Sequence, residues 1–437
     1  MSRRTGRADL PLHGGRVPMW LAQRMSRLGA VLCQAIVLEY GRDELLRRLA
    51  HPFWFQSFGA VMGMDWHSSG ITTSVIGALK RGLAPLSGEL GIHVCGGRGR
   101  YSRRTPDELR AAGERVGFDA DALVRASRMV AKVDSAAVQD GFDLYLHGFI
   151  VGDDGHWVVV QQGMNGGAKQ ARRYHWLSEG LESFLDDPHA AVEGPGQGRI
   201  VNLADRRARA SREAQLGVLR ELGPDAVARE WQRLDVGTAV APPPALASPP
   251  AQLELLPRAE PLPHLVMPDR HDLRASDVVA RRLRGNLAAA ADNGPRDFAE
   301  LLGVPGVGAR TVRALALVAE VLHGTPCRFS DPARFALAHG GKDRHPFPVP
   351  TRVYDQTIAV MKRAVIAAKL GRDEQLAAVR RLDAQARRLE GSASGPTVEA
   401  LIAEERALSH RYGGRSVFGW EPAPAANAPI KQRARKR

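Results

Sequence analysis

The sequence predicts an α+β N-terminal domain followed by an all-α helix-hairpin-helix domain. Strand-like segments joined by turn residues occur in the first half of the chain, whereas the second half carries helical periodicity. Between them, nine prolines fall from Pro242 to Pro268, and such a segment is an extended linker. We therefore expect an α+β domain over residues 1–236, a linker over 237–268, a helical domain over 269–412 and a basic, disordered tail over 413–437.

The first distinctive segment is the apolar run over residues 53–79, whose only charged side chain is Asp65, with His67 two residues on. A run of this length predicts core, where an unpaired carboxylate costs several kcal/mol. Two explanations of Asp65 stay open. It caps backbone groups together with the Ser68–Gly70 turn, or it belongs to a functional site.

A helix is predicted from Asp121 to Gln139. At about 100° per residue its apolar face includes Asp134, while the opposite face is basic. The basic face carries Arg125, Arg128, Lys132, Ser135 and Gln139. Asp134 is thus a second buried carboxylate. Asp140 follows just past the helix, where it either ends the helix in a turn or joins the site.

A β-hairpin comes next. The residues of Phe142–Val151 and His156–Met164 favour strands, and Gly152–Gly155 is a strong turn signal. A four-residue loop would pair Val151 with His156 and place Gln162 diagonal to His147 on one face. The following segment, Ala168–Trp176, brings Arg172, Arg173 and His175 to the same region.

These polar residues form a candidate metal-dependent site. The expected convergent set is Asp65, His67, Asp134, Asp140, His147, Gln162 and His175. Oxygen and imidazole ligands suit Mg²⁺ or Mn²⁺, and also Zn²⁺, so we expect the ion on Asp65, Asp134, Asp140 and His147. Catalysis would use Asp65, His67, Asp134, Lys132, His147 and Gln162. Lys132 and Arg172 would face the phosphate of a phosphodiester.

The spacing matches no known metal or nucleotide motif. The three cysteines are far apart and contain no C-x-x-C, which predicts no iron–sulfur cluster and no disulfide framework. There is no Walker loop and hence no expected nucleotide cofactor. Gly96–Arg100 resembles a glycine-rich phosphate loop only loosely, and a flexible basic loop is the preferred interpretation.

The second half of the chain contains the segment that predicts a helix-hairpin-helix. Helices are predicted over Pro295–Leu302 and Ala309–Leu322, with a glycine-containing turn between them. Backbone N–H groups at Gly306, Val307 and Gly308 would meet a phosphate. We expect the side chains of Arg310, Thr311, Arg172 and Arg173 to contact nucleic acid as well. An ordinary helix–turn–helix connection is the alternative.

The region from His271 to about His339, which contains the hairpin, is expected to be helical. Other helices are expected over Ala204–Leu234, Thr351–Arg388 and Thr397–Arg411. The net charge of +14 and pI near 10.3 favour a polyanionic partner. Lys431–Arg437 carries five cations in seven residues and would add nonspecific affinity. No membrane-spanning run or signal-peptide core is evident. We expect a cytoplasmic, nucleoid-associated protein that binds DNA, including branched or single-stranded forms, alongside other repair proteins.

Several blocks of the chain resemble one known family. They lie at residues 4–21, 65–80, 127–141, 158–165, 173–177, 306–321 and 331–343. The chain resembles the archaeal and bacterial family catalogued as domain of unknown function 763, over roughly residues 3–365. The resemblance implies that both halves form one working unit. It brings no assigned reaction, so no catalytic residue is transferred from it.

Three functions follow as hypotheses. The first is a metal-dependent nuclease in DNA repair or processing, held on DNA by the helix-hairpin-helix. The second is a non-enzymatic DNA-binding adaptor or architectural protein. The third is a base-excision glycosylase, because helix-hairpin-helix glycosylases carry a catalytic Asp about twenty residues after the hairpin, where this chain has Asp331. Ser330-Asp331-Pro332 is also a typical helix N-cap, which explains that Asp structurally.

Overall fold

The computed structural model describes most of the chain up to residue 333. The described residues are 10–11, 19–64, 70–168, 170–238 and 280–333, with short pieces at 359, 361–364, 366, 378, 380, 407, 415–416 and 419–420. The expected linker, the helices beyond residue 350 and nearly all of the basic tail therefore lie outside the described residues.

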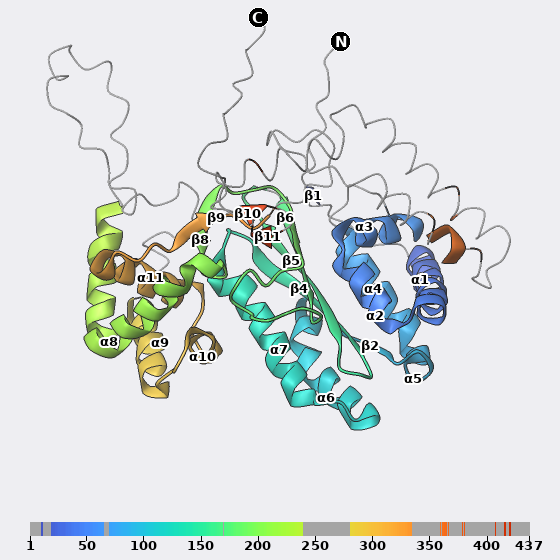
Figure 1. The fold of residues 1–437 in the computed structure, drawn as a ribbon, viewed down its shortest axis with the longest axis horizontal. Helices are drawn as coiled ribbons and strands as arrows, with labels where there is room; N and C mark the ends of the chain where they lie inside the picture. Colours follow the sequence, from blue (N-terminus) through green and yellow to red (C-terminus); the bar gives the residue numbers. More distant parts are fainter. Residues whose placement is uncertain are drawn as a thin grey trace, which may run out of the picture.

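An antiparallel sheet of six strands forms the centre of the molecule (Figure 1). The order is β1-β6-β5-β4-β2, and β7 pairs with β6. The strands are β1 (Leu10–Pro11), β2 (Ile92–Arg98), β4 (Asp143–Gly152), β5 (Trp157–Asn165), β6 (Gln170–Leu177) and β7 (Ala191–Glu193). Long apolar runs such as Trp157–Val160 suit it, because both faces of the sheet are covered.

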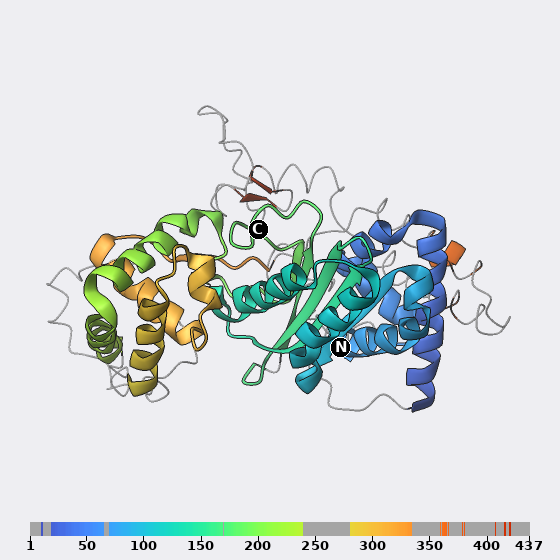
Figure 2. The same ribbon diagram turned by 90° about the horizontal axis from the view of Figure 1, so that it is seen from below.

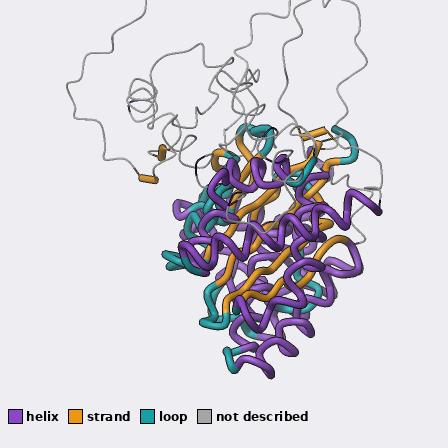
Figure 3. The backbone as a smooth tube through the Cα atoms, turned by 90° about the vertical axis from the view of Figure 1, so that its right-hand side faces the viewer, coloured by secondary structure: helices purple, strands orange, loops and turns teal. Residues whose placement is uncertain are grey.

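Helices cover both faces, so the strands lie between layers of helix (Figure 3). Val158 and Val160 pack in the core cluster that holds α1 to α4, whereas Trp157 and Val159 pack in the cluster that holds α6 and α7. The helices are α1 (Met19–Tyr40), α2 (Arg42–Ala50), α3 (Pro52–Val61), α4 (Gly70–Leu83), α5 (Ser87–Leu90), α6 (Thr105–Val116) and α7 (Ala120–Lys132). Short 3₁₀ segments are η1 (Ala84–Leu86), η2 (Gly99–Arg104) and η4 (Arg206–Ala208).

A second group of helices lies beyond α7, at the opposite end of the molecule from α1 (Figure 2). It consists of α8 (Arg209–Thr238), α9 (Ala280–Asn293), α10 (Phe298–Gly303) and α11 (Ala309–His323). Its apolar side chains belong to the same core cluster as the α7 face of the sheet. Gly223, with φ +73°, and Pro224 break α8 in the middle. None of the described helices is long and apolar enough to span a membrane.

The two halves of the chain also share a three-stranded sheet. It has the order β3-β8-β9, formed by Val138–Gln139, Arg199–Asn202 and Arg328–Ser330. A separate strand pair joins β10 (Arg415–Ser416) to β11 (Gly419–Trp420). The α+β prediction for the N-terminal region is confirmed. The helical region expected from His271 to about His339 is not helical near its end, because residues 328–330 pair with β8 instead.

The helix predicted over Asp121–Gln139 is also shorter than expected. α7 ends at Lys132, and Val133–Ala137 (η3) forms a π-helical turn before the chain enters β3. π-helical turns are rare and occur frequently at functional sites. Here the turn changes the direction of the residues that follow, so Gln139 does not continue the exposed basic face.

The predicted register of the β4–β5 hairpin is off by one residue. Val151 pairs with Trp157, and His147 pairs with Gln161 rather than Val160. Gly152 N–H donates to His156 O over 2.8 Å, so three residues form the loop, and Gly155 takes φ +83°. A one-residue slip turns every side chain to the other face of the strand. Gln161 therefore faces His147, and Gln162 faces the opposite helical layer.

The left-handed Gly155 should set this register. Gly155→Ala is expected to lower the free energy of unfolding by about 1 kcal/mol, because its backbone disfavours a Cβ while the site offers open space around one. Urea denaturation measures the change. Gly88→Ala is the control, since Gly88 also has open space and no positive φ. Equal effects of the two substitutions would contradict the turn assignment.

Candidate functional site

A buried chain of hydrogen bonds crosses from α7 into the sheet. Gln161 Nε2 donates to Asp134 Oδ2 over 2.5 Å, which leaves Gln161 Oε1 to accept from His147 Nδ1 over 2.6 Å. His147 Nε2 then accepts from the Ser127 hydroxyl over 2.9 Å. Burial lowers the pKa of His147, with Gln161 opposing it, and the neutral ring fits one donor and one acceptor nitrogen. Both ring nitrogens of His147 therefore form hydrogen bonds within this network.

Asp134 is the hub of this network. It is fully buried in the π-helical turn, and two further donors reach it. Trp176 Nε1 donates to Oδ2 over 2.9 Å, and His189 Nε2 lies 2.5 Å from Oδ1. Three side chains from separate segments therefore converge on one carboxylate. This arrangement satisfies a buried acid.

The described residues do not bring the expected metal ligands together. Asp134, Asp140 and His147 are absent from the one group of three ligand-bearing side chains with ligand atoms within 4.8 Å, which is Asp43, Asp154 and His156. Both His147 nitrogens and both Asp134 oxygens already have hydrogen-bond partners within the protein. Asp65 and His67 lie outside the described residues. The arrangement of Asp134, Asp140 and His147 therefore does not fit a Mg²⁺ or Mn²⁺ site.

Arg172 holds a buried ion-pair cluster rather than a phosphate. Its guanidinium is fully buried and donates to Asp140 Oδ2 over 2.7 Å and to Asp331 Oδ2 over 2.6 Å. Burial alone would lower the pKa of Arg172, but Asp331 and Asp140 raise it above its ordinary value. Tyr174 donates to Asp140 over 2.6 Å, and the Phe142 ring lies 4.6 Å from the guanidinium. The prediction that Arg172 contacts nucleic acid is wrong, because the Arg172 side chain is fully buried.

The Asp331 carboxylate is also fully engaged in hydrogen bonds and an ion pair. Besides Arg172, it accepts from the N–H groups of Gln197 and Ala333 over 2.6 and 2.9 Å. The Ala333 bond is a local turn of the kind that caps chain segments. A carboxylate with every oxygen engaged by a buried cation and by backbone donors does not face a base pocket. The geometry gives no support to glycosylase chemistry at Asp331.

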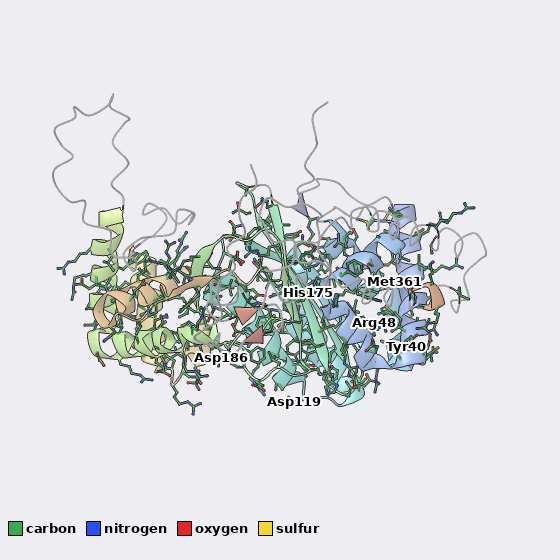
Figure 4. The ribbon with its side chains drawn as sticks, turned by 45° about the horizontal axis from the view of Figure 1, so that its top comes forward. Tyr40, Arg48, Asp119, His175, Asp186 and Met361 are labelled. Atoms are coloured by element: carbon green, nitrogen blue, oxygen red, sulfur yellow. The ribbon has the colours of Figure 1, made fainter. Side chains whose placement is uncertain are left out.

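Arg173 anchors a second buried network on the other face of the sheet. It pairs with Glu193 and donates to Gln56 Oε1 over 2.9 Å. Its Nε donates to His175 Nε2 over 2.9 Å, while His175 Nδ1 lies 3.1 Å from Leu49 O. Burial, followed by the Arg173 charge, holds the pKa of His175 well below its ordinary value. Figure 4 places His175 within the central sheet, so neither residue contacts nucleic acid or a metal as expected.

Two helices, α10 and α11, flank the short turn in the segment predicted as a hairpin. Asp297 caps α10 through Glu300 N–H, so the helix begins at Phe298, three residues after Pro295. Gly306 has φ +87°, and a Cβ there would lie 2.6 Å from Asn286 Oδ1. Gly308, the N-cap of α11, is extended at φ −148° with open space around it. No side chain caps the first turn of α11, which leaves its N–H groups available.

Side chains of the hairpin divide between core and surface. Arg310 is exposed, but Val307 and Thr311 are each 1% exposed. Val307 N–H bonds to Val304 O over 3.1 Å. The expected contacts of the Val307 N–H and the Thr311 side chain with nucleic acid are therefore wrong, because the Val307 N–H already donates to Val304 O and the Thr311 side chain is buried. Gly306, Gly308 and Arg310 remain on the surface.

Two side chains of the N-terminal half hold this hairpin. Lys132 Nζ donates to Val307 O, and Gln139 Nε2 donates to Ala309 O over 2.9 Å. Burial lowers the pKa of Lys132, and the ammonium donates to a neutral carbonyl. Arg128 and Arg125 are exposed, one and two helical turns before Lys132. The basic face of α7 is thereby continuous with the hairpin.

Sequence reasoning missed several members of these networks. Ser127, Gln161, Trp176 and His189 complete the Asp134 network, and Glu193 and Gln56 complete the Arg173 network. The correct register would have identified Gln161, since it alone decides which glutamine faces His147. The surface group Asp43, Asp154 and His156 was also missed. Arg42 lies 3.6 Å from Asp154 and neutralises part of its charge.

Both networks and the hairpin lie within a region shared with one protein family. Residues 6–349 match the family described as protein of unknown function (DUF763). No match was found among curated proteins or among solved structures. The match covers well over half of the chain and includes the sheet, the Arg172 cluster and the hairpin. The chain therefore belongs to the DUF763 family.

Proposed function

We propose that this protein binds the phosphate backbone of DNA without reading its sequence, in a non-enzymatic adaptor or architectural role. The contact would be made by a hairpin surface composed of Gly306, Gly308, Arg310, Arg125 and Arg128. The observation that carries the proposal is the uncapped, open N-terminus of α11 lying against the basic face of α7. It agrees with the helix-hairpin-helix expectation for this segment.

The electrostatics of the hairpin surface favour an anion. A helix N-terminus carries a partial positive charge and unpaired N–H donors. Arg310 adds a full charge beside it, and Arg125 and Arg128 extend the charge along α7. None of these three arginines forms an ion pair with a carboxylate among the described residues. Backbone contacts of this kind position a protein on a duplex and carry no sequence information.

The open space at Gly308 is itself an argument. Gly306 needs glycine for the fold, because of its positive φ and the nearby Asn286. Gly308 needs it for neither reason, since its backbone suits any residue and a Cβ would meet nothing within 4 Å. A ligand that approaches the α11 N–H groups closely would explain the missing side chain.

The nuclease hypothesis keeps less support than simple binding. Asp134 and His147 are buried and saturated, and Lys132 is held by a carbonyl of the hairpin rather than facing a ligand. Asp65 and His67 are the untested part of that hypothesis. We therefore rank the nuclease hypothesis second, after DNA binding without cleavage.

Gly308→Ser should separate folding from binding. Serine is a preferred N-cap, so the free energy of unfolding should stay equal or rise. Its hydroxyl would occupy the α11 N–H groups, and duplex affinity should fall about two- to fivefold. Fluorescence anisotropy with a labelled duplex measures this. Gly217→Ala, in α8, is a control that should stabilise without changing affinity. Unchanged binding by Gly308→Ser would remove the α11 N-terminus from the interface.

Arg310→Gln should weaken binding to two unrelated duplexes equally, because the contact is to phosphate. The slope of log affinity against log salt should become shallower by about 0.9, the value of one phosphate contact. Arg296→Gln is the matched control, since Arg296 is exposed on the same module but already paired with Glu300. A loss confined to one sequence, or an equal loss in the control, would argue against the hairpin surface.

Asp134→Asn tests the nuclease alternative directly. We expect no Mg²⁺- or Mn²⁺-dependent cutting of single-stranded, duplex, flapped or four-way DNA by the unmodified chain. We also expect Asp134→Asn to lower stability by about 2 kcal/mol, because it sets an amide donor against buried donors. Asp121→Asn, at an exposed position of α7, should change nothing. Metal-dependent cutting that is lost in a folded Asp134→Asn protein would instead establish the nuclease.

A further inference from the structure

A second basic surface lies where β2 ends. The 3₁₀ segment η2 and its flanks form one tight turn rich in arginine. We name it the η2 surface, and it consists of Arg98, Arg100, Tyr101, Arg103 and Arg104. All five side chains are exposed. None of the four arginines has an ion pair with a carboxylate among the described residues.

The glycines of this segment serve a fixed backbone and not a flexible loop. Gly96 has φ +82°, and a Cβ there would lie 2.3 Å from His147 O. Lys80 donates to Gly96 O over 2.7 Å, and Glu108 accepts from Gly96 N–H over 2.7 Å. Within the turn, the Ser102 hydroxyl donates to Gly99 O over 2.6 Å. The η2 surface is therefore a built structure that holds its arginines in one place.

An exposed aromatic ring lies among these cations. Tyr101 is 42% exposed, so its ring is accessible to a ligand. The Arg100 guanidinium lies 5.2 Å from its ring centroid, and Lys80 Nζ lies 5.9 Å from it. The Arg100 hydrogen bond and charge lower the pKa of Tyr101, and Arg104 and Lys80 add to the effect. The ring thus lies in a positive field.

We infer that the η2 surface binds single-stranded nucleic acid, with a base stacked on Tyr101 and the arginines on the flanking phosphates. A flat exposed ring beside unpaired arginines matches what an unstacked base and its backbone require. A paired duplex buries its base faces and offers no partner for the ring. An acidic protein or an anionic membrane would need the charges and not the ring. This inference is independent of the hairpin surface, which was assigned to duplex backbone.

Substitutions at the ring test the stacking contact. The probe is a labelled oligothymidylate longer than the roughly 4–16 nucleotides of a typical single-strand site. Tyr101→Ala should reduce its affinity about tenfold, whereas Tyr101→Phe should keep it within about twofold, since both rings stack. Equal affinity for Tyr101→Ala and the unmodified protein would overturn the inference. The hairpin variant Arg310→Gln should retain oligothymidylate binding, so the two surfaces can fail separately.

Charge removal tests the phosphate contact with a matched control. The double variant Arg100→Gln/Arg103→Gln should bind oligothymidylate with a salt slope shallower by about 1.4, at about 0.7 per single-strand phosphate. The pair Arg229→Gln/Arg233→Gln removes equal charge from exposed positions on α8 and should leave the slope unchanged. An equal decrease of the salt slope in both double variants would show that net charge, and not the η2 surface, causes the effect. Binding to phosphatidylserine vesicles that is lost in the η2 variants, with oligothymidylate binding intact, would assign the surface to a membrane.

Discussion

The Arg172 ion-pair cluster is the constraint on which the rest of the structure depends. A fully buried guanidinium is tolerable only when its charge is matched, and removing one partner of such a pair costs about 3–5 kcal/mol. Arg172 takes its partners from three places: Asp140 after the π-helical turn, the Pro195 carbonyl, and Asp331 beyond β9. These contacts fix β6, η3 and the chain after α11 relative to one another. The hairpin is consequently held where Lys132 and Gln139 can reach its backbone.

The sheet separates two polar networks with similar logic. On one face Asp134 gathers donors from β5, β6 and the segment before β7, and on the other Arg173 gathers acceptors from α3, α4 and β7. Alternation along β6 places Arg172 and Tyr174 toward one face, and Arg173 and His175 toward the other. Buried networks that are fully satisfied specify one arrangement of the elements around them. The concentration of polar residues in these strands is thus explained by architecture, and the outer surfaces carry the proposed binding.

Much of the fold could be predicted from the sequence, because local patterns set it. The turn at Gly152–Gly155, the apolar runs of β4 and β5, and the helices around Val304–Gly308 all follow from short-range chemistry. The candidate site could be predicted only in part. Asp134 was correctly identified as a buried acid, but its partners depend on the strand register, which shifts by one residue because the loop has three residues and not four. The sequence pattern predicts that Arg172, Arg173 and Thr311 lie on the surface. They are buried because they pack or pair with residues far away in the sequence, and a local pattern does not show such contacts.

The pairing of β8 with β9 also has a consequence for how the chain folds during synthesis. Arg172 and Asp331 are 159 residues apart, and ribosomes add roughly 5–20 residues per second. For roughly ten to thirty seconds the nascent N-terminal half therefore carries an interior cation without its bidentate partner. During that interval the edge strand β8 also offers unpaired backbone groups to other chains. The Arg172 ion-pair cluster and the pairing of β8 with β9 are therefore completed only after Asp331 and β9 have been synthesised.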